Sequence, residues 1–123
     1  MEKQKLILIA EDDPSVNRLI TFKLGKEGFK VRSTSDGKEA LKAALEEDID
    51  AAIIDVMMPF LDGIQVLKRI RAEKPQLPVI ILTVKSRGED IHKALELGAD
   101  QYMTKPFQTA ELVKSLKSLL GEL

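Results

Sequence analysis

The stretch DAAIIDVMMP, residues 50–59, decides how the rest of the chain is organised. Its apolar run has the length of a strand and ends in the carboxylate of Asp55, and Pro59 stops any continuation. A strand with so few polar side chains is typical of a parallel sheet covered on both faces. Ligands bind such sheets at the carboxyl ends of the strands, where Asp55 is predicted to lie. Acids also end strands and cap turns without further function, so the other strand ends must decide.

The composition is that of a soluble globular protein. Of the 123 residues, 44% are hydrophobic and 32% are charged, which excludes the disordered and fibrous classes. The net charge of −1 gives no electrostatic case for binding nucleic acid or an anionic membrane. The absence of cysteine excludes disulfides and thiolate chemistry, and a single histidine excludes a multi-histidine metal site.

The two ends of the sequence bear on location and domain number. The N-terminus is charged and leads directly into an apolar strand pattern, and no apolar run reaches membrane-spanning length. We therefore expect a cytoplasmic protein. The sequence stops just after its last predicted helix, so we also expect a single domain, residues 1–123, that acts alone.

The apolar patterns along the chain predict five strands that alternate with five helices. The predicted strands are residues 6–10, 30–33, 51–55, 78–83 and 101–104, and the predicted helices start at Pro14, Gly37 and Asp62 or span residues 89–97 and 109–120. The connections are too short for a second domain. Strict alternation of this kind predicts an α/β protein whose parallel sheet has helices on both faces.

Polar side chains follow four of these strands. Glu11 and Asp12 follow the first strand, Asp55 ends the third, Thr83 ends the fourth, and Lys105 follows the fifth. Each has an ordinary structural explanation when taken alone, since acids are favoured before a helix and lysines are common on surfaces. The carboxyl ends of parallel strands lie at one edge of the sheet, however, so these side chains are expected to converge.

The chemistry of this set indicates a metal and a phosphoryl group. Crowded carboxylates repel one another unless a cation lies among them, and hard oxygen ligands favour Mg²⁺ or Mn²⁺. A hydroxyl and an ammonium group complement phosphoryl oxygens, and an aspartate can itself accept a phosphoryl group. Two further residues have simpler interpretations: His92 as a solvent-facing helix residue and Tyr102 as a partly buried strand aromatic.

The order and spacing of five motifs resemble the response regulator receiver domain of two-component signalling, over essentially the whole chain. The motifs are LIAEDDP at 8–14, DVMMP at 55–59 with DG at 62–63, ILT at 81–83, GADQY at 98–102 and TKPF at 104–107. Each motif is weak alone, but together at these intervals they are highly specific. The resemblance implies a flavodoxin-like, doubly wound sheet with the strand order 2-1-3-4-5.

The resemblance also implies a regulatory domain rather than an enzyme, one that catalyses only its own phosphorylation and dephosphorylation. Asp55 would be the phospho-acceptor, with a histidine kinase, a phosphotransfer protein or a small phosphodonor as the source. Asp12, Asp55 and the backbone carbonyl of Met57 would bind Mg²⁺, with Mn²⁺ as an alternative, and Glu11 would act through a bound water. Thr83 would contact the phosphoryl group.

Lys105 and Tyr102 complete the set that the resemblance implies. Lys105 would bind the phosphoryl group or, in its absence, pair with Asp55, and the Lys105–Pro106 bond would be cis. Tyr102 would turn inward as Thr83 moves. The output face would be formed by the fourth helix, the fifth strand and the last helix, and would bind a downstream protein or a second copy. Its predicted members are Ile91, Leu95, Gln101 and Val113.

Three departures from the family pattern bear on these expectations. Glu11 is a common variant whose role is expected to survive with a longer reach. Val84 stands where the family usually has a small residue, which narrows access to the site. Ile91, Gln101 and Ser115 replace the arginine, aspartate and arginine that the winged-helix transcription factors use to dimerise, which argues against that dimer, although Asp100, Glu111 and Lys117 keep the face charged.

Three other classes fit parts of the sequence. A haloacid-dehalogenase-like phosphatase would place a second acid two residues after Asp55, but Met57 stands there and no cap domain is present. A flavodoxin would have a hydroxyl-rich loop after the first strand, where this chain has acids that repel phosphate. A receiver-like module that no longer uses phosphate would be expected to lack some of the acids, the threonine or the lysine.

Overall fold

The computed structural model of the protein describes residues 3–84 and 87–122. Strands and helices alternate along the chain, as the apolar patterns predict. The strands are β1 (Leu6–Ala10), β2 (Lys30–Thr34), β3 (Ala51–Asp55), β4 (Val79–Thr83) and β5 (Gln101–Thr104), and the helices are α1 (Pro14–Lys26), α2 (Gly37–Glu46), α3 (Gly63–Glu73), α4 (Gly88–Glu96) and α5 (Thr109–Leu119). The predicted strand and helix boundaries are within one residue of these wherever both ends were predicted.

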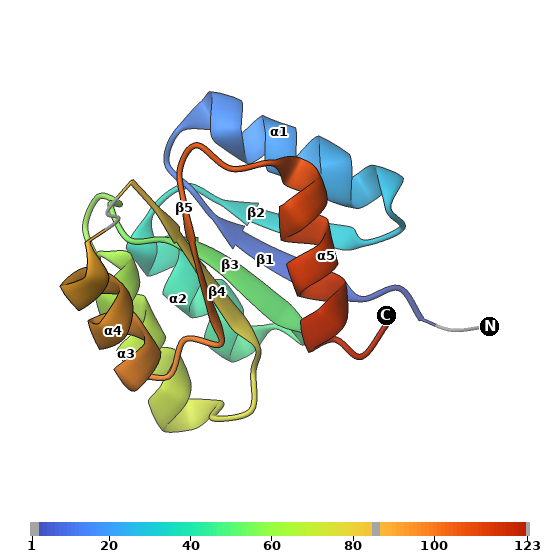
Figure 1. The fold of residues 1–123 in the computed structure, drawn as a ribbon. Helices are drawn as coiled ribbons and strands as arrows, with labels where there is room; N and C mark the ends of the chain where they lie inside the picture. Colours follow the sequence, from blue (N-terminus) through green and yellow to red (C-terminus); the bar gives the residue numbers. More distant parts are fainter. Residues whose placement is uncertain (1–2, 85–86, 123) are drawn as a thin grey trace.

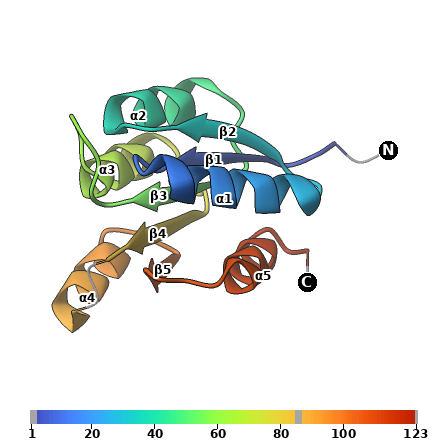
Figure 2. The same cartoon turned by 90° about the horizontal axis from the view of Figure 1, so that it is seen from above.

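The strands form a single parallel sheet with the order β2-β1-β3-β4-β5, which confirms the predicted topology (Figure 2). The register aligns the carboxyl ends of the central strands, because Ile54 of β3 pairs with both Ala10 of β1 and Ile81 of β4. Thr83 at the end of β4 pairs with Thr104 at the end of β5. The loops that follow β1, β3, β4 and β5 therefore leave the sheet at one edge.

Helices cover both faces of the sheet (Figure 1). On one face α1 and α5 bury a cluster that includes Ile20 and Leu116, and on the other α2, α3 and α4 bury a cluster that includes Ala44 and Leu67. All five residues of β3 and of β4 are buried. Complete burial of these strands explains why their sequences are almost continuously apolar.

Aspartates begin three of the helices. Asp13, Asp36 and Asp62 each precede a helix, and their side-chain oxygens accept hydrogen bonds from backbone N–H groups of the first turn. Asp13 therefore has the structural role that acids before a helix commonly have. His92 is exposed on α4, where it pairs with Glu96, as expected for a solvent-facing residue.

The apolar spacing of α1 does not by itself identify the face that the helix buries. Val16, Leu19, Ile20 and Leu24 keep helical spacing, but the side chain of Leu19 is 52% exposed. The buried residues of α1 are instead Asn17, Ile20 and Leu24. The buried stripe of α1, with its three- and four-residue spacing, thus begins at a polar residue.

None of the helices in the described part of the chain is long and apolar enough to cross a membrane.

Candidate metal centre at the carboxyl ends of the strands

Three predicted acids meet at the carboxyl edge of the sheet. Glu11, Asp12 and Asp55 each offer a carboxylate oxygen that lies within 4.8 Å of the others, a spacing that a single metal ion can bridge. Glu11 is 1% exposed and Asp55 is 4% exposed, whereas Asp12 is open to solvent. The loops after β1 and β3 thus bring together residues that lie more than forty positions apart in the sequence.

Lys105 lies between two of the acids. Its Nζ donates a hydrogen bond to Asp55 Oδ2 over 3.1 Å, which is the ion pair implied by the resemblance, and lies 2.6 Å from Glu11 Oε1. Glu11 Oε1 is buried. Its contact with Lys105 is an ion pair without hydrogen-bond alignment, and it accepts no hydrogen bond from the described residues. The other oxygen of Glu11 accepts from the Asp13 backbone N–H over 3.0 Å.

Burial and the neighbouring charges shift two pKa values at this site. Burial raises the pKa of Glu11 to about 7, the close contact with the Lys105 ammonium group and the hydrogen bond from the Asp13 N–H oppose that rise, and the charge of Asp55 adds to it. Burial lowers the pKa of Lys105, but the close contacts with the carboxylates of Asp55 and Glu11 and their negative charges outweigh it, so the net pKa is raised. One ammonium group therefore serves two buried carboxylates.

This arrangement fits a hard divalent cation. Among the described residues of the site, three carboxylates face one ammonium group, that of Lys105, so negative charge is in excess there. Carboxylate oxygens are the ligands that Mg²⁺ prefers, and Mg²⁺ commonly binds through one or two of them while it keeps several waters. Asp12, Asp55 and Glu11 therefore have the right chemistry for such an ion.

The loop after β3 depends on a glycine. Gly63 donates its N–H to the Val56 carbonyl over 2.8 Å, and a Cβ at position 63 would collide with the carbonyl of Asp55. Met57 donates its N–H to Asp55 Oδ1 over 3.1 Å, so the backbone of the predicted ligand Met57 lies against the acceptor carboxylate. Close packing of Gly63 thus brings the start of α3 up against the end of β3.

Exposed apolar side chains follow the ends of β3 and β4. Met57 is 53% exposed, Phe60 77% and Val84 60%. Phe60 has a φ of 69°, a left-handed conformation that is uncommon for a bulky residue, and Lys38 of α2 lies over its ring at 5.6 Å from the centroid. That Val84 narrows access to the site stays a prediction, which its exposure alone does not test.

Thr83 and Tyr102 occupy neighbouring strands. Thr83 ends β4 and is completely buried, and its carbonyl accepts a hydrogen bond from the Lys105 N–H over 2.8 Å. Tyr102 of β5 is half-buried against the cluster beneath α4, and burial, followed by the charge of Asp90, raises its pKa. The Lys105–Pro106 peptide bond is cis, as the resemblance implies.

The predicted output face needs one correction. Leu95 is 45% exposed, and Ile91 and Gln101 are half-buried, so all three reach the surface. Val113 is only 6% exposed and belongs to the cluster between α5 and the sheet. Its neighbours Leu112 and Leu116 are buried with it, so Val113 lies on the inward side of α5 and not on the output face.

The sequence analysis did not identify Asn17. Asn17 is 9% exposed, and its side-chain amide donates to the Glu11 carbonyl at the start of the acidic turn. A signal was present in the sequence, because Asn17 occupies a core position three residues before Ile20 and seven before Leu24. A polar residue at such a position needs buried hydrogen-bond partners, and only the tertiary structure identifies them.

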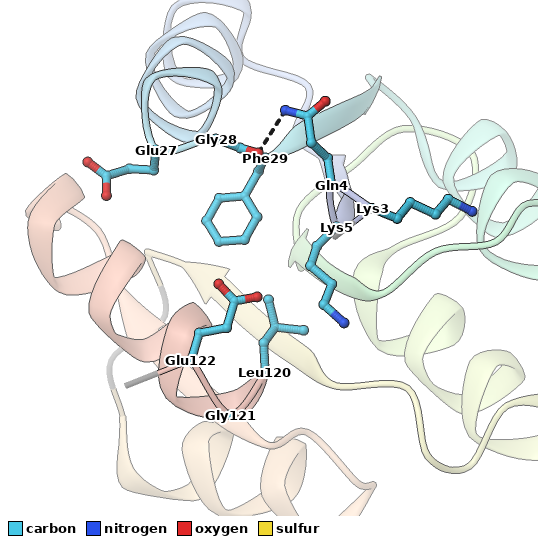
Figure 3. Close-up of a pocket in the computed structure, with 9 residues that line it drawn as sticks. All are labelled: Lys3, Gln4, Lys5, Glu27, Gly28, Phe29, Leu120, Gly121 and Glu122. Carbon is cyan, nitrogen blue, oxygen red and sulfur yellow. Dashed lines mark hydrogen bonds between the residues drawn. The ribbon is translucent and has the colours of Figure 1, made fainter. Parts of the chain in front are cut away.

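A broad hollow of about 800 Å³ lies elsewhere on the molecule, at the amino-terminal edge of the sheet (Figure 3). The Phe29 ring and Leu120 form its apolar part, Glu122 lies beside Leu120, Glu27 lies farther out at the end of α1, and Gln4 donates to the Gly28 carbonyl. The hollow contains none of the predicted site residues. Size therefore does not identify the functional site, whereas the clustering of acids does.

Comparison with known proteins agrees with the fold and identifies the family. The family model for the response regulator receiver domain matches residues 7–117. The chain therefore belongs to the response regulator receiver domain family, which confirms the family inferred from the motifs. The general function of the family is that of a phosphorylation-activated signalling switch. Membership of this family excludes the phosphatase and flavodoxin alternatives.

Individual relatives support the same assignment. The chain is 44% identical over 116 residues to the alkaline phosphatase synthesis transcriptional regulatory protein PhoP of Bacillus subtilis, which covers 94% of this chain and 48% of PhoP. It is 38% identical over 114 residues to the probable transcriptional regulatory protein TcrX of Mycobacterium tuberculosis, covering 93% of this chain and 49% of TcrX. The chain thus spans about half the length of the curated relatives it matches.

A solved structure also matches over nearly its whole length and contains a metal. The receiver domain of the sensor histidine kinase PA1611 from Pseudomonas aeruginosa has a TM-score of 0.88 and 32% identity, with coverage of 97% of this chain and 99% of that one. That structure has a magnesium ion coordinated in its active-site cleft.

Proposed function

We propose that Asp55 accepts a phosphoryl group in a Mg²⁺-dependent reaction that the domain itself catalyses. A carboxylate oxygen of Asp55 attacks phosphorus, an O–P bond forms, and the bond from phosphorus to the donor's nitrogen or oxygen breaks. The leaving group takes the electron pair of the broken bond. Hydrolysis reverses the modification when water attacks phosphorus and the carboxylate of Asp55 leaves.

Lys105 and Thr83 recognise the transferred group in this proposal. The Lys105 ammonium already donates to Asp55, so it needs only a short movement to pair with a phosphoryl oxygen on that side chain. Thr83 ends the neighbouring strand and offers a hydroxyl at the same edge of the sheet. Both roles are positional, since neither residue forms a covalent bond.

Asp12 and Asp55 are the proposed direct metal ligands, together with the Met57 carbonyl, and Glu11 acts through water. When bound, the divalent cation neutralises charge on the phosphoryl oxygens and orients the group for in-line transfer. Mn²⁺ has the same preference for oxygen and is proposed as a substitute. The Glu11 carboxylate pairs with Lys105. In the proposal this ion pair holds Lys105 at the site when phosphorylation changes the partners of Asp55.

The observation that carries the proposal is the convergence of three acids and one lysine around a buried Asp55. A buried carboxylate within 4.8 Å of two others has no structural advantage, because its burial is costly and its neighbours repel it. A bound cation and an incoming phosphoryl group give this cluster a chemical purpose.

The test is phosphorylation by phosphoramidate in the presence of Mg²⁺, followed by intact-mass measurement. The protein should gain one phosphoryl mass, and the gain should disappear in Asp55→Asn or in EDTA. Asp62→Asn is the matched control, because Asp62 is an exposed helix cap in the loop after β3 and asparagine caps equally well. A mass gain in Asp55→Asn at the wild-type rate would falsify the assignment.

The proposed output runs from Thr83 through Tyr102 to the face formed by α4, β5 and α5. Receiver domains of this family act between histidine kinases and downstream effectors. For this chain we propose a histidine kinase or phosphotransfer protein as donor, and a downstream protein or a second copy as the partner of Ile91, Leu95 and Gln101. A cytoplasmic location and action as a separate domain of residues 1–123 stay predictions from the sequence.

A further inference from the structure

Asn17 occupies a buried position one turn into α1, beside the acidic loop. Its Nδ2 donates two hydrogen bonds of 3.0 Å, one to the carbonyl of Glu11 and one to the carbonyl of Thr34 at the end of β2. The Glu11 N–H donates to the same Thr34 carbonyl over 3.1 Å. Asn17 thus continues the pairing of β1 with β2 beyond the last residue of β1.

The orientation of the Asn17 amide is determined by its partners. Its Oδ1 accepts from Ser33 Oγ over 2.6 Å and from Thr21 Oγ1 over 3.3 Å. Two carbonyls can only accept and two hydroxyls are free to donate, so a single orientation satisfies all four contacts. A side chain with two donors and an acceptor at its tip is required, and aliphatic residues of similar size lack them.

Asn17 also fixes the backbone on both sides of Asp12. The side chain holds the Glu11 carbonyl, which belongs to the peptide group before Asp12, and the Asn17 N–H donates to the Asp13 carbonyl over 2.9 Å. The carboxylate of Asp12 projects from this short segment into solvent, within 4.8 Å of the other two acids. The direction of the Asp12 side chain therefore depends on contacts that Asn17 makes.

We propose that Asn17 is a positioning residue for the metal site, which it serves by holding the turn that carries Glu11 and Asp12. The inference rests on the proposed function in one respect, that the acidic cluster binds Mg²⁺. Groups that hold metal ligands in place commonly change metal affinity by about 10- to 100-fold when they are removed. Asn17 touches no metal ligand atom, so it acts through the backbone alone.

The experiment compares Mg²⁺ affinity in Asn17→Ala and in the control Ser33→Ala. Ser33→Ala removes a partner of Asn17 Oδ1 but leaves both donors to the carbonyls in place. Titration with MgCl₂, followed by amide NMR, gives the dissociation constant for each folded protein. We expect Asn17→Ala to bind Mg²⁺ about tenfold more weakly than wild type, and Ser33→Ala to remain close to wild type.

Urea unfolding in EDTA separates positioning from simple stabilisation. A purely structural role would lower the stability of Asn17→Ala and leave the Mg²⁺ dissociation constant of the folded protein unchanged, which would overturn the inference. Equal weakening in both variants would overturn it as well, because general damage to the network would then be the cause. Saturating Mg²⁺ should restore the phosphorylation rate of Asn17→Ala, since the chemical groups themselves remain.

Asn17→Asp provides the second variant, in case Asn17→Ala does not fold. It keeps the shape of the side chain, removes the two donors and adds a negative charge beside Glu11 and Asp12. Charge alone predicts tighter Mg²⁺ binding, whereas loss of positioning predicts weaker binding, so unchanged or tighter binding would reject the inference. A wild-type protein that fails to bind Mg²⁺ would refute the proposed function, a result distinct from equal binding by wild type and variants.

Discussion

The two edges of the sheet use their acids in opposite ways. At the amino-terminal edge, Asp50 accepts a hydrogen bond from the Leu6 N–H over 2.7 Å. Asp100 accepts from the Val79 N–H over 2.8 Å and from Arg71 Nη2 over 2.9 Å. Each of these carboxylates therefore satisfies a backbone group at the start of a strand.

At the carboxyl-terminal edge the acids are crowded. Glu11 and Asp55 share the single ammonium group of Lys105, and Glu11 Oε1 accepts no hydrogen bond within the described ranges. Burial raises the pKa of Glu11, which records how poorly its charge is compensated. The acids at this edge therefore weaken the fold in the absence of a ligand.

The contrast separates structural acids from functional ones by their donors rather than by their burial. An acid with a full set of backbone or guanidinium donors stabilises the fold, and its removal leaves a buried donor without a partner. An acid in a cluster with too few donors is available to a ligand. The following predictions test this contrast, from the largest expected effect to the smallest.

Asp100→Ala should lose the most stability. The Val79 N–H is completely buried and would lose its acceptor, and Arg71 would lose its partner, so we expect a loss of about 1–3 kcal/mol in the free energy of unfolding. Asp55→Asn, measured in EDTA, should be no less stable than wild type, because it removes a crowded charge. Urea denaturation of both variants measures the difference, and a larger loss in Asp55→Asn would contradict the contrast between the two edges.

Asp12→Ala should weaken Mg²⁺ binding by tenfold or more, roughly 1.4 kcal/mol, because a direct ligand and a negative charge are both lost. Its stability in EDTA should rise, since less repulsion remains among the acids. The measurements are Mg²⁺ titration by NMR and thermal denaturation in EDTA. Asp13→Asn is the control, because Asp13 caps α1 and asparagine also caps well. Lower stability of Asp12→Ala in EDTA would show that crowding is the wrong explanation.

The sequence predicts much of this carboxyl-terminal edge for a simple reason. Strand patterns are local, and the end of a parallel strand fixes the edge at which its last side chains emerge. Glu11, Asp12, Asp55, Thr83 and Lys105 could therefore be assigned to one site before any contact was known. That Glu11 and Asp55 share the ammonium group of Lys105 depends on distances in the folded protein, which no local sequence pattern contains.

The sequence analysis fails where neighbouring elements determine what a helix buries. Leu19 keeps apolar spacing yet faces solvent, and Asn17 is polar yet buried, because β2 supplies hydrogen-bond partners exactly where α1 packs. Val113 was assigned to the output face from the position of α5, but its side chain lies on the side of the helix that packs against the sheet. In both helices the uncertainty is the rotation of the helix about its own axis, which decides the face that packs against the sheet and is set by tertiary contacts.

Thr83→Ala should separate phosphorylation from its output. Asp55 and the other two acids remain in this variant, so phosphorylation should continue. The Thr83 hydroxyl, which would move toward the phosphoryl oxygens to hydrogen-bond with them, is lost. In the proposed switch the Tyr102 ring has an outward and an inward position. The phosphoryl group can favour the inward position only by as much free energy as it gains from interacting better with that state. Amide NMR with and without beryllofluoride should therefore show smaller shifts in α4 and β5 for Thr83→Ala than for wild type. Equal shifts in the two proteins would exclude coupling through Thr83.

The smallest effect is expected from a partly exposed ion pair outside the acidic cluster. Lys117 of α5 donates to Glu27 at the end of α1 over 2.8 Å, and Lys23 lies 3.7 Å from the same carboxylate. The hydrogen bond from Lys117, followed by its charge, lowers the pKa of Glu27. The pair therefore contributes stability above the ordinary glutamate pKa, and this contribution disappears as the pH falls through the lowered value.

Lys117→Met tests this pair, with Lys114→Met as the control on an exposed position of the same helix. Lys117→Met should be slightly less stable than wild type at neutral pH, and the difference should shrink as Glu27 becomes protonated in acid. Salt should reduce it as well, because both partners are accessible to solvent. Urea unfolding at several pH values measures the difference. If the stability difference between Lys117→Met and wild type persisted unchanged in acid, its cause would be lost packing of the lysine stem and not the ion pair. Glu27 would then not count among the acids that stabilise the fold by pairing.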